Sequence, residues 1–314
     1  MDLAAASAIA VENLVKRYKA ATAVDGISFQ LPAGTVTGLL GGNGAGKTTT
    51  INILTTLIKA DGGTAAVAGY DIAARPHKVR NEISLTGQFA AVDNRLTGRE
   101  NLLLIGDLRH VADSAKTAAD LLRRFGLEEA ADRGVSTFSG GMRRRLDIAM
   151  SLIGSPAVIF LDEPTTGFDP EARNEMWRTI HKLAEGGTTV FLTTQHLDEA
   201  DELADDIAVL HQGRIVASGT ASELKKLVPG GLIELTFRDE QTRDAAAKVL
   251  GKSYACLEGE EATLTITTDG TVAEVAGIFV GLRDARIEPT EFSQKVATLD
   301  DAFLKITGSS REDK

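Results

Sequence analysis

A glycine-rich segment at residues 41–48 has the residue types and the spacing of a phosphate-binding loop. It fits G-x-x-x-x-G-K-[ST], follows a run that favours a strand, and precedes a helical pattern, which argues against a chance glycine turn. Backbone N–H groups of such a loop surround phosphate oxygens, and the helix that follows points its positive end toward them. We expect Lys47 to add a point charge and the Thr48 hydroxyl to ligate Mg²⁺. The residues expected to contact the nucleotide here are Gly41, Gly42, Asn43, Gly44, Ala45, Gly46, Lys47, Thr48 and Thr49.

Two adjacent carboxylates, Asp162 and Glu163, follow the continuous apolar run 158–161. Such a run predicts a strand buried on both faces that delivers acids at its carboxyl end. Asp162 suits the Mg²⁺ shell, and Glu163 suits a water aligned with a γ-phosphate. A solvated turn fits the pair of acids equally well when it is taken alone. Together with the glycine-rich loop, the pair favours nucleotide hydrolysis.

A third segment, Ser139-Gly140-Gly141, precedes the helical pattern 143–152. A hydroxyl and free N–H groups at a helix start form an anion site, although the same residues are also a common helix cap. The successive arginines 143–145 cannot share one helix face, and we interpret them as a solvated stripe.

The elements that must position these residues alternate between strands and helices. Strands are expected at 8–15, 27–31, 35–40, 64–68, 83–86, 157–161, 188–193, 206–210 and 214–217. Helical spacing follows residue 46, where Ile51, Leu54, Leu57 and Ile58 mark one apolar face, and it continues through 99–155, over 170–184 and from 197. The alternation predicts an α/β core with parallel strands and an inserted helical region at about 89–155.

A second, smaller domain is expected after a change of register at residues 229–231. The expected order is β-α-β-β-α-β, a ferredoxin-like α+β unit, followed by a last helix at 299–306. Its elements are expected at 232–237, 240–250, 254–257, 262–267, 271–282 and 286–292. We therefore predict an ATP-binding domain at 1–220, a linker at 221–230 and an accessory or regulatory domain at 231–314.

Composition narrows the function further. The chain has 314 residues, of which 43% are hydrophobic and 25% charged, as in folded globular proteins. A formal charge of −10 disfavours binding to nucleic acid or to anionic lipid. The single Cys256 cannot form an internal disulfide, and no apolar run reaches the roughly 18 residues that a spanning helix needs. The N-terminal residues lack the basic region of a signal peptide, so we expect any membrane role to require a partner.

Taken in order, these motifs resemble the nucleotide-binding subunit of ATP-binding cassette (ABC) transporters, over roughly residues 8–220. The resemblance implies that Tyr18 stacks on adenine and that Gln88 senses Mg²⁺ and a membrane partner. It also implies that Ser139, Gly140 and Gly141 close over ATP held by a second copy, that Asp169 contacts that copy, and that His196 reaches the γ-phosphate. The expected catalytic residues are then Glu163, His196 and Lys47, and the expected Mg²⁺ ligands are Thr48, Gln88 and Asp162.

A narrower resemblance is to daunorubicin-resistance type exporter ATPases. It is carried by residues 87–93, 96–102, 139–146 and 299–304, and it implies a separate small membrane protein that exports drugs or lipid-like molecules. Departures from the ABC pattern are Gly42 for Pro, Phe138 and Phe168 for Leu, and Met142 for Gln. None of these four positions supplies an expected phosphate-binding side chain or metal ligand.

The resulting hypothesis is an ATP-hydrolysing exporter subunit, peripheral on the cytoplasmic face of the membrane. It would form a homodimer around two MgATP and act on a polytopic permease, without nucleic acid. A soluble ABC ATPase of translation normally has two cassettes, and a DNA-associated one has a long coiled coil between the phosphate loop and the Ser-Gly-Gly motif. This chain has one set of motifs and a short interval between Lys47 and Ser139. A purely regulatory binder would show nucleotide affinity without turnover.

Overall fold

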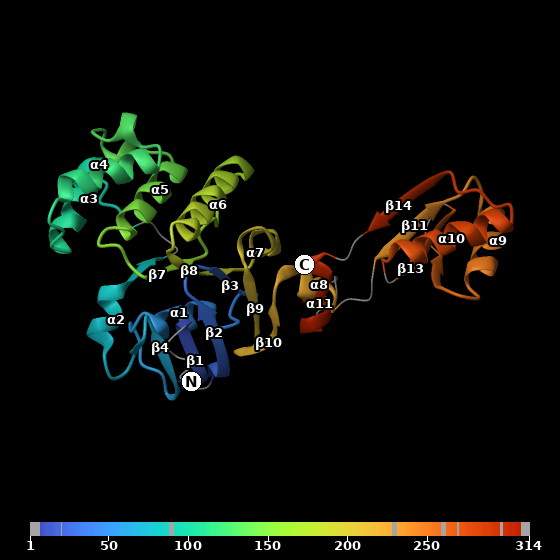
Figure 1. Ribbon diagram of the computed structural model, residues 1–314, viewed down its shortest axis with the longest axis horizontal. Helices are drawn as coiled ribbons and strands as arrows, with labels where there is room; N and C mark the ends of the chain where they lie inside the picture. Colours follow the sequence, from blue (N-terminus) through green and yellow to red (C-terminus); the bar gives the residue numbers. More distant parts are fainter. Residues whose placement is uncertain are drawn as a thin grey trace. The chain divides into compact units, whose positions relative to one another are not determined.

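The computed structural model describes residues 7–19, 21–87, 91–227, 231–258, 262–268, 270–295 and 298–308. The chain divides into two compact units, Met1–Ala221 and Ser222–Lys314. Each unit has helices and strands of its own (Figure 1). Each also has a hydrophobic core of its own. All of the candidate site residues belong to the first unit.

An antiparallel sheet opens the first unit. Its strands are β1 (Ser7–Tyr18), β2 (Ala21–Pro32), β4 (Gly62–Val67) and β5 (Tyr70–Asp71), in the order β2-β1-β4-β5. The apolar residues Ile9, Val11 and Leu14 of β1 are fully buried and join one core cluster with α1 (Lys47–Leu54). This sheet thereby holds one side of the helix that follows the glycine-rich loop.

A second, mostly parallel sheet forms the centre of the first unit. Its strands are β3 (Val36–Leu40), β6 (Ile83–Thr86), β7 (Val158–Asp162), β8 (Thr189–Thr194), β9 (Asp206–His211) and β10 (Arg214–Gly219). Their order is β10-β9-β3-β8-β7-β6, and only the β9–β10 pair among these strands is antiparallel. All residues of β3, β7 and β8 are buried, which explains the continuous apolar run Val158–Leu161 of β7. Because parallel strands end at the same edge, the segments after β3, β7 and β8 meet there.

Helices pack beside this sheet, and two details differ from the expectation. Helix α1 ends at Leu54, so Leu57 does not extend its apolar face and is 62% exposed. The Thr55 hydroxyl bonds the Ile51 carbonyl and Thr56 takes a positive φ of 64°, which together end the helix. The sequence analysis also missed β5 and the short helix α2 (Pro76–Glu82). The other helices here are α6 (Pro170–Glu185) and α7 (Leu197–Leu203).

The inserted helical region is present. It contains α3 (Gly98–Leu108), α4 (Ser114–Arg124) and α5 (Gly140–Ser151), with 3₁₀ turns at Glu128–Ala130 and Val135–Thr137. Side-chain caps fix the helix starts, namely Thr97 for α3, Asp113 for α4 and Ser139 for α5. None of the helices in the described part of the chain has both the length and the apolar character to cross a membrane.

The second unit has the element order that the sequence predicts. Strands β11 (Leu232–Thr236), β12 (Ala255–Glu258), β13 (Thr263–Thr267) and β14 (Glu291–Lys295) form an antiparallel sheet in the order β12-β13-β11-β14. Helix α9 (Glu240–Leu250) joins β11 to β12, α10 (Val272–Asp284) joins β13 to β14, and α11 (Leu299–Thr307) follows.

Two boundaries in this part of the chain need correction. The segment predicted as a linker, 221–230, begins with the helix α8 (Ala221–Lys225), in which Leu224 is buried. The last strand starts at Glu291 and not at 286, because Arg286 has a φ of 55°, which interrupts the extended backbone. Pairing with β11 begins only where the Thr290 N–H bonds the Thr236 carbonyl.

Candidate nucleotide-binding site

The glycine-rich loop passes so close to other backbone that side chains are excluded at two positions. A Cβ at Gly41 would lie 2.4 Å from the Leu210 carbonyl oxygen, and one at Gly46 would lie 2.3 Å from that of Ala23. Gly46 also has a φ of 110° and is the residue that precedes α1. The close backbone approach and the positive φ at Gly46 therefore both require glycine at this position.

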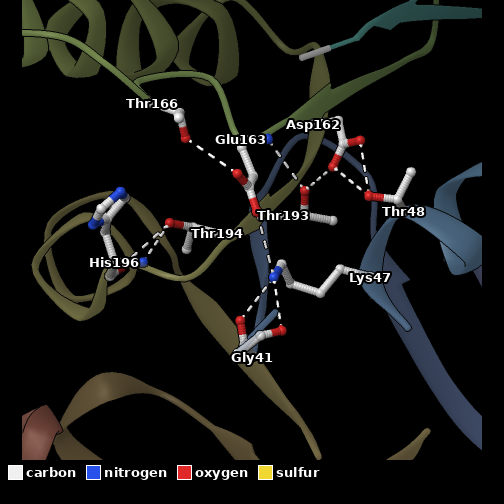
Figure 2. Close-up of polar contacts among 10 residues, drawn as sticks. Gly41, Lys47, Thr48, Asp162, Glu163, Thr166, Thr193, Thr194 and His196 are labelled. Carbon is white, nitrogen blue, oxygen red and sulfur yellow. Dashed lines mark hydrogen bonds and ion pairs between the residues drawn. The ribbon is translucent and has the colours of Figure 1, made fainter. Parts of the chain in front are cut away.

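Lys47 lies buried at the start of α1, with 5% of its surface exposed. Its Nζ donates to the carbonyl oxygens of Gly41 and Gly42 at 2.8 and 3.1 Å and lies 3.4 Å from Glu163 Oε1 (Figure 2). The ammonium group is thus placed inside the loop, where a phosphate oxygen would meet it.

Oxygen atoms suited to Mg²⁺ converge beside this lysine. Thr48 Oγ1 donates to Asp162 Oδ2 at 3.1 Å and lies 3.4 Å from Oδ1, while Thr193 Oγ1 donates to Oδ1 at 2.5 Å. A hydroxyl and a carboxylate are the hard donors that Mg²⁺ prefers, and Mg²⁺ usually keeps waters and substrate phosphates as its other ligands. The residues present therefore fit the ion that the sequence predicts.

Glu163 is held in an unfavourable backbone conformation. Its φ is 47°, while its N–H bonds Thr193 and its Oε2 accepts from Thr166 Oγ1 at 3.2 Å (Figure 2). A positive φ at a residue other than glycine persists only where neighbouring contacts impose it, as at functional sites. The strain turns this carboxylate out of the line of β7 and toward the lysine.

His196 precedes α7, and Tyr18 ends β1. The His196 N–H donates to Thr194 Oγ1, in the last residue of β8, at 2.9 Å. Tyr18 is 47% exposed and pairs with Ala21 across the β1–β2 hairpin. Ala23, two residues after Ala21, is the residue whose carbonyl oxygen lies against Gly46. The Gly41 N–H bonds the Thr194 carbonyl, so His196 lies two residues from a contact between the loop and β8. The contacts of His196 and Tyr18 with a nucleotide stay predictions.

The Ser-Gly-Gly motif and Asp169 line one open groove of about 340 Å³. Ser139 Oγ accepts from the Met142 N–H at 3.2 Å, and Asp169 Oδ1 accepts from the Ala172 N–H at 2.9 Å. Both residues therefore cap helices, as the alternative interpretation of the Ser-Gly-Gly motif held for Ser139, and both also line the groove. Its other lining residues are Gly140, Gly141, Arg145, Gly167, Phe168, Glu171, Ala172 and Glu175.

Gln88 lies outside the described residues. Gly87 and Ala91, the described residues on either side of 88–90, contact Arg144 and Asp147. The sequence did not single out this pair. The interpretation of residues 143–145 as a solvated stripe is wrong for Arg144, which is only 5% exposed. A helix pattern cannot reveal this, because the partners of Arg144 come from distant segments.

A buried acid on α7 was also missed. Glu199 is fully buried, and its Oε1 accepts from Thr165 Oγ1 at 2.7 Å and from Trp177 Nε1 at 3.4 Å. Burial raises the pKa of Glu199 above its ordinary value. A signal existed, because Glu199 stands four residues before the buried Leu203 and so shares its helix face.

The chain matches a family model described as "ABC transporter" over residues 24–166. These residues include the glycine-rich loop and the two carboxylates after β7.

Curated relatives match over almost the whole chain. The daunorubicin/doxorubicin resistance ATP-binding protein DrrA of Streptomyces peucetius is 45% identical over 312 residues, which cover 98% of this chain and 94% of that relative. The doxorubicin resistance ATP-binding protein DrrA of Mycobacterium tuberculosis is 41% identical, with 97% and 95% covered. The Nod factor export ATP-binding protein I of Burkholderia lata is 36% identical, with 96% and 97% covered.

Solved structures confirm the predicted fold class of the first unit. MJ1267, an ATP-binding cassette of an ABC transporter in its ADP conformation, has a TM-score of 0.63 and 28% identity, and the match covers 69% of this chain and 92% of that one. The protein cbiO1 of Clostridium perfringens, part of an ABC transporter complex, has a TM-score of 0.66 and 26% identity, with 70% and 90% covered. Fold, site geometry and relatives agree, so this chain belongs to the ABC transporter family as an ATP-binding subunit that hydrolyses ATP.

Proposed function

We propose that this chain is the ATPase of an ABC exporter that drives efflux of a drug or lipid-like amphiphile through a separate membrane subunit. The observation that carries the proposal is the convergence of Lys47, Thr48, Asp162 and Glu163 at one sheet edge. The relatives named for daunorubicin and doxorubicin resistance support a drug as cargo, and the one named for Nod factor export supports export as the direction of transport.

In the proposed reaction the loop 41–48 holds the phosphates and Lys47 neutralises their charge. Thr48, Asp162 and Gln88 would hold Mg²⁺, which when bound stabilises charge on the phosphate oxygens. Glu163 orients the attacking water, and its strained backbone fixes where its carboxylate points. His196 contacts the γ-phosphate side, and Tyr18 stacks on adenine.

Two copies are proposed to close head to tail around two MgATP. In that arrangement Lys47 and Thr48 of one copy face Ser139 and Gly140 of the other. The open groove that contains Ser139, Gly141 and Asp169 supports this, because it offers helix-start N–H groups on an accessible surface. Hydrolysis would remove the γ-phosphate and separate the copies.

The proposed location is the cytoplasmic face of the cell membrane, where the chain is attached through its permease. The Gln88 segment and the helical insert of about 89–155 would pass motion from the ATP sites to that permease. The proposed division is an ATP-binding domain at 1–220, with residues 231–314 as an accessory or regulatory part without a catalytic role.

The test uses Glu163→Gln in the native host. This change keeps the side-chain volume but removes the base, so ATP should be bound without turnover and the closed dimer should accumulate. Pull-down from membranes with ATP should recover a polytopic membrane protein, which is then identified by mass spectrometry. The control is Glu163→Gln combined with Lys47→Ala, which should recover none.

Other outcomes separate the parts of the proposal. Normal ATP turnover by Glu163→Gln would contradict the role given to Glu163. Recovery of ribosomes or DNA-bound proteins in place of a membrane protein would favour a non-transport ATPase and exclude the export function.

A further inference from the structure

Helix α5 carries a buried ion pair, Arg144 with Asp147, to which the family resemblance assigned no role. Arg144 Nη1 lies 3.2 Å from Asp147 Oδ2, and each residue is 5% exposed. Burial raises the pKa of Asp147 above its ordinary value. Two charges buried in this way are retained at a desolvation penalty, so stability alone is a poor explanation for them.

The remaining contacts of the pair go to the backbone of two other segments. Arg144 Nη1 donates to the Gly87 carbonyl at 2.6 Å, and Asp147 Oδ1 accepts from the Ala91 N–H at 3.0 Å. These two backbone groups flank residues 88–90, among which is Gln88. One ion pair therefore fixes both sides of the segment that carries the predicted Mg²⁺-sensing glutamine.

The same guanidinium also reaches the segment after β7. Its Nε donates to the Pro164 carbonyl at 3.3 Å, and its Nη2 lies 3.5 Å from the Asp162 carbonyl oxygen. Glu163 stands between these two residues. Arg144 is therefore bonded on one side to the flank of Gln88 and on the other to the backbone that directs Asp162 and Glu163.

We propose that Arg144 and Asp147 are positioning residues for ATP hydrolysis, which hold Gly87 and Ala91, the described neighbours of the segment that carries Gln88, relative to the backbone of Asp162 and Pro164. Because α5 begins at the Ser139 cap, the pair also links the Ser-Gly-Gly groove to the hydrolytic residues of the same chain. The inference deepens the proposed function and rests on it for the role of Gln88.

The test replaces the pair by apolar residues of similar length, Arg144→Met with Asp147→Leu, in the full chain. Replacing a buried ion pair as a whole is often neutral for stability, whereas removing one partner is not. We expect the double variant to melt below the parent temperature, because the Gly87 and Pro164 carbonyls and the Ala91 N–H lose these side-chain partners. It should keep the KM for ATP within about threefold, while kcat falls at least about tenfold. A purely structural pair would change stability without this split between kcat and KM.

Combining the double variant with Gln88→Ala tests whether the ion pair affects kcat through the segment that carries Gln88. Gln88→Ala alone should lower kcat, and adding it to the double variant should lower kcat no further, because both changes act through one segment. The matched control is Arg143→Lys on the same helix, which bonds only the Val135 and Ser136 carbonyls and should keep the parent kcat.

Two results would overturn the inference. One is a kcat of the double variant equal to that of the parent. The other is a kcat of the triple variant that falls by the product of the losses in the double variant and in Gln88→Ala. If the double variant does not fold, Arg144→Lys decides the question, since it keeps the charge but has a single nitrogen for four acceptors. A folded Arg144→Lys protein with parent kcat would contradict the proposal. An inactive parent protein would instead count against the proposed function.

Discussion

Individual residues at this site are held by contacts that each serve more than one group. Thr193 shows this, because its hydroxyl donates to Asp162 while its carbonyl accepts the Glu163 N–H. Neither Asp162 nor Glu163 can therefore move without the other. The sequence predicted both acids from their place after an apolar run, but it did not reveal Thr193, because its contacts join two strands 31 positions apart.

Glu199 gives a prediction at this scale. Burial raises its pKa in the folded protein above the ordinary 4.5, so the unfolded chain loses its proton at lower pH than the native protein does. The free energy of unfolding should therefore fall as pH rises above about 4.5, until the native group also ionises. Glu199→Gln keeps an acceptor for Thr165 and Trp177 and removes this titration, so the variant should gain stability relative to the parent across that range.

Melting temperatures of both proteins between pH 5 and pH 8 test this expectation. Glu202→Gln on the same helix is the control, because Glu202 is exposed and its substitution should give a pH profile parallel to that of the parent. Parallel profiles for Glu199→Gln as well would mean that Glu199 is ionised in the native state throughout this range.

Whole elements were predictable where the signal lies within one stretch of sequence. The run that became β7 is apolar from Val158 to Leu161 and is buried on both faces, so its character needs no partner to be interpreted. Helix α9 was predicted with the bounds that it has. The contacts of Arg144 on α5 and the shifted start of β14 depend on segments far away in the chain, which no local pattern contains.

The turn between β3 and α1 carries a prediction at the scale of elements. Gly46→Ala places a Cβ 2.3 Å from the Ala23 carbonyl oxygen at a φ of 110°, so β2 or the loop must move. We expect the change to destabilise the first unit by roughly 2 kcal/mol or more and to abolish detectable ATP binding. Gly42→Ala is the matched control for stability, because a Cβ there meets nothing within 4 Å and should change stability by less than about 0.5 kcal/mol.

Thermal unfolding and nucleotide binding of the two variants test the argument. Equal melting temperatures for Gly46→Ala and Gly42→Ala would show that the loop accommodates a side chain beside β2. In that case the requirement for glycine at position 46 would not come from backbone approach.

At the scale of the whole molecule, charge bears on how the chain reaches a membrane. A formal charge of −10 repels anionic lipid, and none of the described helices can cross a bilayer. Attraction to an anionic surface needs clusters of Lys and Arg, each worth about 1 kcal/mol near the surface. We therefore expect the purified chain not to sediment with vesicles of phosphatidylglycerol at about 0.15 M salt, with or without ATP.

The same chain should sediment with vesicles that contain the permease identified by pull-down. This binding should persist at about 0.5 M salt, because shape complementarity would hold the two proteins together and long-range charge would not. The control is the same vesicles with an unrelated membrane protein at equal density. Binding to protein-free vesicles that is lost on adding salt would show a basic surface that outweighs the net charge. Recruitment would then be a property of this chain alone, and the permease would add only specificity.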